Sequence, residues 1–232
     1  MIENSQLLYQ CKDCSLRQLS TLIVHEDEFD PMCRNTVQLH FSKGETILKQ
    51  GGRATNLLFL HRGVVKFSYR YDTGSNYIMT IITGPKLVGG ANLFFRDINI
   101  FSLTAMEDCE VCMVDIEDFK GLALRNPTYV LAMIEQAMDM FQHSIFNFIS
   151  LAHNHVNGRI ATVLLYLWDH VYKDSEYKFT VSRKELAEFA ACSHENVINT
   201  LSRFRREGLI EFEGKKIVIL NHETLTEISK KG

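Results

Sequence analysis

The chain has 232 residues, of which 46% are hydrophobic and 23% charged, and its formal net charge is −3. This balance is typical of a folded globular protein and excludes collagen-like, low-complexity and largely disordered chains. The length allows two modest domains, each with its own core. Because the sequence shows neither a secretory signal nor an uninterrupted run of 18 apolar residues, we expect a cytoplasmic protein without membrane contact.

The charge is slightly acidic overall, and the C-terminal third is less acidic without being strongly basic. Any binding of nucleic acid must therefore depend on where individual charges are placed. The sequence also contains six cysteines. A reducing compartment argues against structural disulfides, so metal binding, redox sensing and simple burial remain open for these thiols.

Short apolar runs separated by glycine-containing turns extend from Val37 to about Val114. Within the first run Val37, Leu39 and Phe41 alternate with polar residues, and the same pattern recurs further along the chain. Alternation with a period of two is typical of half-buried strands. Many short strands at such close spacing predict a small β-barrel or β-roll.

A long helix is predicted over residues 126–157. Asn126 and Pro127 are typical of a helix start, and no further Gly or Pro occurs before Gly158. Apolar residues recur along it at spacings of three and four, which is the pattern of a packing seam. This seam either covers the chain's own β-roll or, as the helix length favours, forms a dimer interface through Val130, Ile134, Ala137, Phe141, Ile145 and Phe148.

The C-terminal segment carries two closely spaced helix starts. Ser182 and Glu185 form a capping-box pattern, which predicts a supporting helix. Ser193 is a second candidate cap, and the following amphipathic segment, from His194 to about Glu207, ends before Gly208. Two apolar runs around a basic Gly-Lys-Lys tip then predict a β-hairpin. Together these features predict a winged helix-turn-helix that binds double-stranded DNA.

The outward face of the second helix mixes groups that read bases with groups that bind phosphate. Glu195 and Asn199 lie one turn apart near its N-terminal end, and their side chains suit cytosine and adenine in the major groove. Basic and hydroxyl side chains suit phosphate contacts. The simpler interpretation is an ordinary solvated face, but the combined pattern favours DNA binding by Ser182, Lys184, Ser193, His194, Glu195, Asn199, Ser202, Arg203, Arg205, Arg206, Lys215 and Lys216.

This order of segments resembles the CRP/FNR family of bacterial transcription regulators. The resemblance covers nearly the whole chain, and its most specific parts are residues 41–51, 60–66, 158–161 and 191–210. It implies an α+β protein with a β-roll sensor domain of the cyclic-nucleotide-binding type over residues 1–125. A dimerisation helix over 126–157 and a winged helix-turn-helix over 158–232 would follow. It also implies a homodimer on a palindromic site and, for an activator, contact with RNA polymerase.

The sequence departs from the family pattern in two places. In the recognition helix, His194 and Asn199 stand where arginines are usual, while Glu195 is kept, so a different half-site is expected. In the β-roll, Gly89-Gly90-Ala91-Asn92 and Asn99-Ile100-Phe101-Ser102 replace the motifs that hold cyclic AMP. The second replacement removes the arginine that would pair with the cyclic phosphate, so cyclic AMP is an improbable ligand.

The N-terminal cysteines resemble the loop by which FNR-type members hold an iron-sulfur cluster. Cys11, Cys14 and Cys112 match three of the expected ligands, but Ser20 replaces the remaining loop cysteine. A four-ligand site would need a substitute such as Cys33 or Cys109, or a carboxylate such as that of Asp13. Cys109 and Cys192 fit plain burial better.

The sensor therefore has three open interpretations: an iron-sulfur or zinc-thiolate site, a thiol redox switch, or a pocket for an unidentified small molecule. Catalysis is not expected. The sequence contains no Ser/His/Asp grouping and no phosphate-cradling Gly-Lys-Ser/Thr loop, and His153 and His155 are spaced so that their rings point apart.

Overall fold

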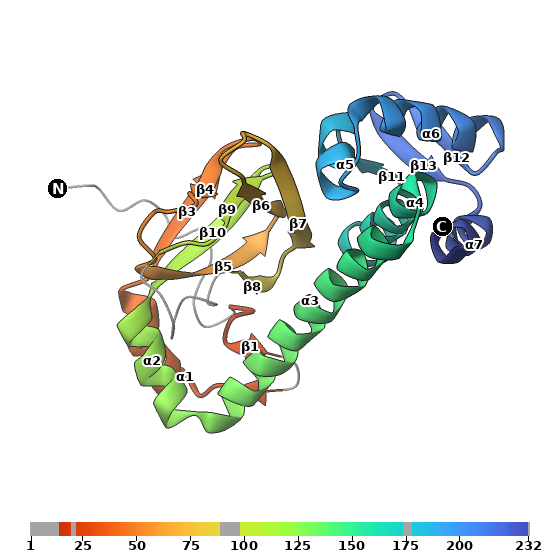
Figure 1. The fold of residues 1–232 in the computed structure, drawn as a ribbon. Helices are drawn as coiled ribbons and strands as arrows, with labels where there is room; N and C mark the ends of the chain where they lie inside the picture. Colours follow the sequence, from red (N-terminus) through yellow and green to blue (C-terminus); the bar gives the residue numbers. More distant parts are fainter. Residues whose placement is uncertain (1–13, 20–21, 89–97, 174–177, 232) are drawn as a thin grey trace. The chain divides into compact units, whose positions relative to one another are not determined.

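The computed structural model describes residues 14–19, 22–88, 98–173 and 178–231 (Figure 1). The chain divides into two compact units, one drawn from residues before 67 together with 83–140, the other from 67–82 and from 141 onward. A strand-rich N-terminal part, a long helix and a C-terminal helix-turn-helix follow one another along the chain. This order confirms the predicted α+β fold class.

The strands of the N-terminal part form small antiparallel sheets. β1 pairs with β2, and two four-stranded sheets have the orders β3-β10-β5-β8 and β4-β9-β6-β7. The strands are β1 (Gln18–Leu19), β2 (Leu22–Ile23), β3 (Val37–Phe41), β4 (Thr46–Leu48), β5 (Asn56–Arg62), β6 (Val64–Arg70), β7 (Asn76–Thr83), β8 (Lys86–Val88), β9 (Ser102–Ala105) and β10 (Cys109–Asp115). The predicted β-roll is therefore present, with β10 paired between β3 and β5 and a register shift toward β5 between Glu110 and Val111.

Three helices occur in this stretch of the chain: α1 (Glu26–Arg34), α2 (Ile116–Arg125) and the long α3 (Pro127–His153), whose residues from 141 onward belong to the second unit. Apolar side chains from α1, α2, β5 and the first turn of α3 form one buried cluster that includes Phe29, Phe59, Phe119 and Tyr129. The phenol of Tyr129, only 1% exposed, donates a hydrogen bond of 2.6 Å to the carbonyl oxygen of Leu16. The cluster thus ties the segment before β1 to the base of α3.

The long helix ends four residues before the predicted end. The Asn154 side chain donates to Ser150 Oγ at 3.0 Å and to the Ser229 carbonyl at 2.6 Å. These bonds hold the chain outside the helix. The next helix, α4 (Val156–Tyr166), is followed by a π-helical turn η2 (Leu167–Val171).

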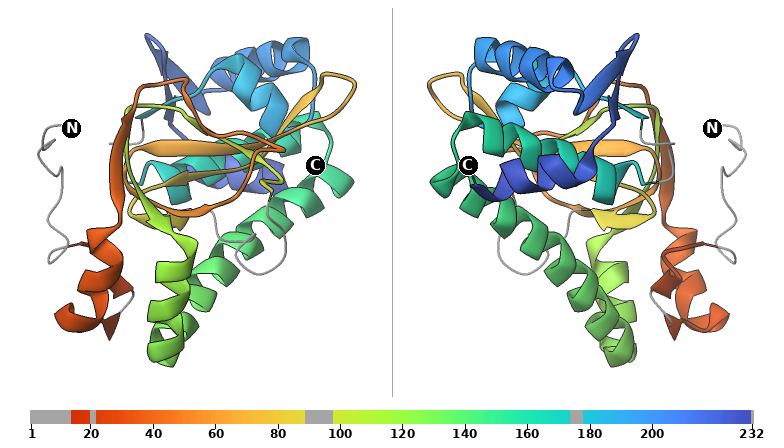
Figure 2. Two further views of the ribbon diagram at one scale, coloured as in Figure 1. Left: turned by 90° about the vertical axis from the view of Figure 1, so that its left-hand side faces the viewer. Right: turned by 90° about the vertical axis from the view of Figure 1, so that its right-hand side faces the viewer.

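The C-terminal domain places its helices around a three-stranded sheet. It contains β11 (Lys178–Thr180), α5 (Arg183–Phe189), α6 (His194–Arg206), β12 (Ile210–Glu213), β13 (Lys216–Ile219) and α7 (His222–Lys231). The predicted hairpin is β12-β13, but β11 adds a third strand in the order β11-β13-β12. Figure 2 shows α7 packed alongside α4, an arrangement that closes the core of this domain.

Gly63 joins β5 to β6 at a point where the backbone leaves no room for a side chain. Its φ is +106°, and a Cβ there would lie 2.6 Å from Cys109 Sγ and 2.7 Å from the Asp108 carbonyl oxygen. Gly74, in the turn between β6 and β7, also has a positive φ of +86° but has open space around its Cβ position. A side chain at Gly63 would therefore cause both backbone strain and steric overlap, whereas a side chain at Gly74 would cause backbone strain alone.

We expect Gly63→Ala to lower the free energy of unfolding by about 3 kcal/mol or more, because strain and overlap with backbone atoms add together. Gly74→Ala, which introduces the strain alone, should cost only about 1–2 kcal/mol. Urea denaturation of both variants measures the difference. Equal losses would show that the close approach of Asp108 and Cys109 is not a constraint.

Candidate functional site

Local hydrogen bonds set the boundaries of both helices of the helix-turn-helix. Ser182 Oγ accepts from the Glu185 amide at 3.1 Å, and the Glu185 carboxylate accepts from the Ser182 amide at 2.9 Å. This is the predicted capping box at the start of α5. Ser193 Oγ accepts from the Asn196 amide at 3.1 Å and caps α6. Both serine hydroxyls are thus engaged in capping.

The turn between α5 and α6 is held from outside by α4. Ala191 occupies the turn with a φ of +45°, a conformation that is strained for a residue with a Cβ. The guanidinium of Arg159 donates to the Ala191 carbonyl at 3.0 Å, and the buried Thr200 of α6 donates to Asn157 Oδ1 at 2.8 Å. Residues 157 and 159 therefore fix the orientation of α6 relative to the domain core.

Helix α6 has one buried face and one exposed face, as predicted. Val197, Leu201 and Phe204 are at most 2% exposed, and they pack the helix onto its domain. The opposite face presents to solvent the predicted base-reading and phosphate-binding side chains His194, Glu195, Asn199, Ser202, Arg205 and Arg206. The structure thus brings these predicted residues together on a single helix face.

The basic residues of the site differ in their local partners. Arg203 lies 3.7 Å from Glu207, and Arg205 Nε lies 2.9 Å from the Glu211 carboxylate. Exposed Lys184 is 3.9 Å from Glu188. In contrast, Arg206, Lys215 and Lys216 have no carboxylate within 4.0 Å among the described residues. These last three side chains are the ones best placed to bind an external anion.

Arg183 is a residue that the sequence analysis did not select. Its guanidinium lies 5.7 Å from the centre of the Phe212 ring, and that of Arg205 lies 5.8 Å from the same ring. Contacts of this kind between a cation and an aromatic face are attractive. They connect α5 and α6 to strand β12 of the wing, so Arg205 has a structural partner in the wing. The only feature of the sequence that could have indicated a role for Arg183 is its position directly after the helix cap Ser182.

A continuous apolar stripe runs along α3 on the surface of the single chain. Its members are 40–65% exposed and follow one another at alternating spacings of three and four. Ile134, Phe141, Ile145 and Phe148 of the predicted seam belong to it, whereas Val130 is half-buried. The stripe consists of Leu131, Ile134, Met138, Phe141, Ile145 and Phe148.

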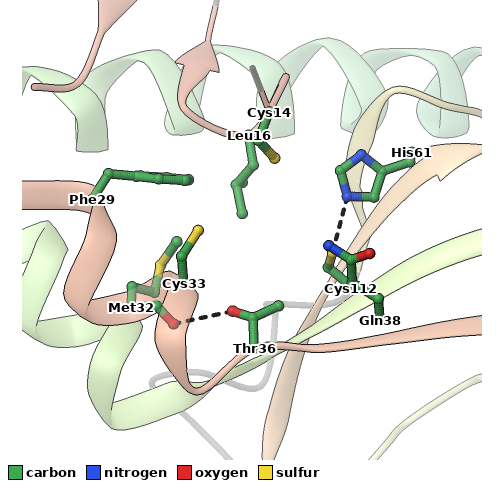
Figure 3. Close-up of a pocket in the computed structure, with 9 residues that line it drawn as sticks. All are labelled: Cys14, Leu16, Phe29, Met32, Cys33, Thr36, Gln38, His61 and Cys112. Atoms are coloured by element: carbon green, nitrogen blue, oxygen red, sulfur yellow. Dashed lines mark hydrogen bonds between the residues drawn. The ribbon is translucent and has the colours of Figure 1, made fainter. Parts of the chain in front are cut away.

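A small cavity in the N-terminal unit gathers three cysteines and a histidine (Figure 3). Cys14 precedes β1, Cys33 is in the last turn of α1, His61 is in β5 and Cys112 is in β10. His61 Nε2 lies 2.9 Å from Cys112 Sγ. Burial lowers the pKa of His61, an effect that the Glu110 carboxylate partly opposes. The imidazole is therefore held toward its neutral form, which is the form that binds metals.

The cavity contains three of the four cysteines predicted as metal ligands. Cys11, the fourth, and Ser20 lie outside the described residues, as do residues 89–97. The ligands available here are three sulfurs and one imidazole nitrogen, a set that zinc accepts. A cluster bound by four thiolates would need a further cysteine.

The remaining two described cysteines are Cys109, which is buried, and Cys192, which is half-buried. Burial, reinforced by the charge of Glu107, raises the pKa of the Cys109 thiol to about 11, and this thiol donates to the carbonyls of Glu107 and Val64. Burial also raises the pKa of Cys192, against the opposing effect of Arg159. Neither thiol is activated. The predicted burial is confirmed for Cys109, whereas Cys192 is only half-buried. The described cysteines are all thiols rather than disulfides.

The segment that replaces the cyclic-phosphate motif is partly described. Asn99 is 7% exposed, and its side chain donates to the Arg53 carbonyl at 3.3 Å. Ser102 Oγ accepts from the Gln50 amide at 3.0 Å. Both polar side chains thus form hydrogen bonds with the backbone of residues 50–53.

The two halves of the chain match two known domain families. Residues 38–126 match the cyclic nucleotide-binding domain, and residues 158–228 match the Crp-like helix-turn-helix domain. No helix in the described ranges is long and apolar enough to cross a membrane.

Similar proteins of known role are transcription regulators. The chain is 26% identical over 225 residues to the transcriptional activator protein FnrA of Stutzerimonas stutzeri, covering 91% of this chain and 88% of that one. It is also 26% identical over 178 residues to the cAMP-activated global transcriptional regulator CRP of Pasteurella multocida, covering 75% and 85%. These relatives are regulators rather than enzymes, which fits the prediction from the sequence that the chain is not a catalyst.

Solved structures share the fold. FixK2 from Bradyrhizobium japonicum superposes with a TM-score of 0.74 at 17% identity, covering 83% of this chain and 96% of that chain. The regulator CLP from Xanthomonas campestris superposes with a TM-score of 0.73 at 20% identity, covering 84% and 99%. With both domain families and the segment order in agreement, the chain belongs to the CRP/FNR family of DNA-binding transcription regulators with an N-terminal sensor domain.

Proposed function

We propose that the protein is a homodimeric regulator that reads a palindromic DNA site with α6 and is controlled through its N-terminal β-roll. The observation that carries this proposal is the exposed face of α6. The opposite face of the helix is buried through Phe204 and Thr200, and Arg159 holds the turn that precedes the helix. A rigidly held helix of this kind suits the major groove, where its N-terminal residues contact base edges.

The exposed face divides the reading of DNA between two groups of residues. Glu195 and Asn199 specify bases, since a carboxylate accepts from cytosine and an amide pairs with adenine. Arg206 and the wing lysines Lys215 and Lys216, which have no acidic partner in the described structure, contact phosphates. The remaining predicted contacts are Ser182, Lys184, Ser193, His194, Ser202, Arg203 and Arg205.

Arg206→Ala should weaken binding to every duplex by about the same factor and reduce the slope of log affinity against log salt by about 1, because one phosphate contact is lost. Glu195→Ala should leave the salt slope unchanged and lose preference at one base pair of each half-site. Selection from random duplexes, followed by titration at several salt concentrations, measures both effects. Lys120→Ala, which removes a half-buried cation paired with Glu117 in α2, is the control outside the DNA-binding domain. Unchanged affinity and sequence preference in both variants would contradict these roles.

The stripe on α3 supports the homodimer. Six large apolar side chains spaced in threes and fours form the seam of a two-helix coiled coil, and the single chain leaves them in water. A symmetric pair of α6 helices would then read two half-sites about 34 Å apart. When the bound protein activates transcription, RNA polymerase is its further partner.

Phe141→Asp should weaken self-association at least about 100-fold, because burial of an aromatic ring is replaced by burial of a charge. Sedimentation over a range of concentrations gives the association constant. The control is Leu124→Asp, which alters an apolar side chain that is 84% exposed on α2, outside the stripe. A wild-type protein that stays monomeric at micromolar concentration would remove the dimer from the proposal.

The route for control begins where Tyr129 binds the Leu16 carbonyl. Leu16 also lines the cavity that contains Cys14, Cys33, His61 and Cys112. A change in that cavity can therefore reach the first turn of α3 through this hydrogen bond and through the buried cluster that contains both Cys14 and Tyr129. This favours sensing by the cysteine cavity over sensing of cyclic AMP, for which the arginine expected near Ser102 is missing from the sequence.

A further inference from the structure

The cavity of Cys14, Cys33, His61 and Cys112 brings together residues from four separate segments. Each comes from a different local structure: the chain before β1, the end of α1, β5 and β10. In Figure 3 the sulfur atoms of Cys14 and Cys33 both point into the space that the labelled residues enclose. Thiolates and imidazoles are both ligands of soft and borderline metal ions, so a cavity that gathers them has the donor set of a metal site.

The pair of His61 and Cys112 already resembles half of a metal site. In a tetrahedral zinc site, with Zn–S of about 2.3 Å and Zn–N of about 2.0–2.1 Å, neighbouring nitrogen and sulfur ligands lie about 3.6 Å apart. The observed separation of Nε2 and Sγ is 2.9 Å. An ion would therefore open this pair by less than 1 Å. The ring of Phe59, with its centroid 4.7 Å from that of His61 in an edge-on contact, holds the imidazole in place.

The surroundings suit a shielded ion. The cavity has a volume of about 10 Å³, which is room for about one water-sized occupant. Leu16, Phe29 and Met32 also line it and are at most 2% exposed. A four-iron cluster is much larger than this space, whereas a single ion fits it.

The side chains have to move together before they can close around an ion. In the described segments, no three His, Cys, Asp or Glu side chains already converge closely enough to hold a metal. Cys14 lies directly before a turn, and Cys33 ends a nine-residue helix. These two thiols are the ones that would move toward the His61–Cys112 pair.

We propose that this cavity binds one thiophilic divalent cation of the zinc type through the sulfurs of Cys14, Cys33 and Cys112 and Nε2 of His61. The ion replaces the thiol protons, which are released to solvent as the thiolates bind. This site deepens the proposed sensor function and depends on it only for the link to DNA binding. Because Leu16 is bonded to Tyr129, metal occupancy acts on the segment that contacts the start of α3.

The test uses the full chain, purified without oxygen. Its iron, sulfide and zinc contents are measured, and the metal-free protein is then titrated with Co²⁺, which reports thiolate ligands by its absorption. We expect about one zinc per chain and saturation at about one equivalent of Co²⁺ with sulfur-to-metal charge-transfer bands.

Ligand variants show which residues bind. Cys33→Ser and His61→Gln should each weaken Co²⁺ binding more than about 100-fold, since loss of a direct ligand exceeds the 10–100-fold effect of losing an outer partner. His61→Cys, which keeps a ligand at the same position, should retain stoichiometric binding. Cys192→Ser and His40→Gln, which alter a thiol and an exposed imidazole outside the cavity, should bind as the wild type does. Retained binding by His61→Cys also shows that substitution at this position leaves the fold intact.

Three results would overturn the proposal: no bound metal and no Co²⁺ spectrum, unchanged Co²⁺ binding in both Cys33→Ser and His61→Gln, or a cluster with several irons and sulfides. Dimerisation and DNA binding of the same metal-free protein are measured in parallel. If these persist while metal binding is absent, only the metal site fails. If metal binds but no DNA site is selected, the proposed function fails instead.

Discussion

One copy of the chain leaves a row of large apolar side chains on the long helix α3 exposed to water. Its stripe of six large apolar side chains is 40–65% exposed, and burying it fully would contribute on the order of 5–10 kcal/mol for each chain. For two chains the gain is on the order of 10–20 kcal/mol, against a cost of association of about 4–15 kcal/mol. The stripe therefore supports the proposed pairing. Paired helices would place two copies of α6 under one symmetry axis, which is what recognition of a palindrome requires.

The same helix shows what periodicity alone can and cannot predict. Ile134, Phe141, Ile145 and Phe148 were predicted as interface residues, and they lie on the exposed stripe. The spacing of three and four also admitted Val130 and Ala137, whereas the structure places the larger Leu131 and Met138 in line with the others. Adjacent rows of a helix satisfy nearly the same period. The choice between them depends on which row the chain's own core covers, and that information is not local.

The helix-turn-helix was predictable because its signals are local. Ser182, Glu185, Ser193 and Gly208 each act within one helical turn, and the structure has these helix ends within a residue or two of the prediction. The supports of the turn were not predictable. Arg159 donates to the backbone carbonyl of Ala191, 32 positions away. Thr200 donates to the side chain of Asn157, 43 positions away. Strand β5 was also obscured, because Leu57 to Leu60 are all buried and a strand covered on both faces does not alternate.

His61 escaped prediction for a similar reason. No motif links it to Cys112, which is 51 residues further along the chain. Only the antiparallel pairing of β5 with β10, in which Leu60 lies opposite Val111 and Phe59 opposite Cys112, brings the imidazole to the thiol. The distant cysteine was predicted from a family resemblance, but its histidine neighbour required the register of the sheet. A ligand set drawn from several strands and loops becomes visible only when the fold is known.

The contacts at the two ends of α3 give a physical basis for control. At its first turn, Tyr129 binds the segment that carries Cys14. At its last turn, Ser150 donates to Thr162 of α4 at 3.0 Å, and the following Asn154 binds α7. Each end is therefore bonded to one domain by a few specific groups, and the helix between them is continuous. In the proposed homodimer, a shift of the Cys14 segment would therefore act on the helix that carries the proposed interface stripe. Coupling of this kind needs no change within the DNA-binding domain itself, because its α4–α6 supports are internal and stay intact.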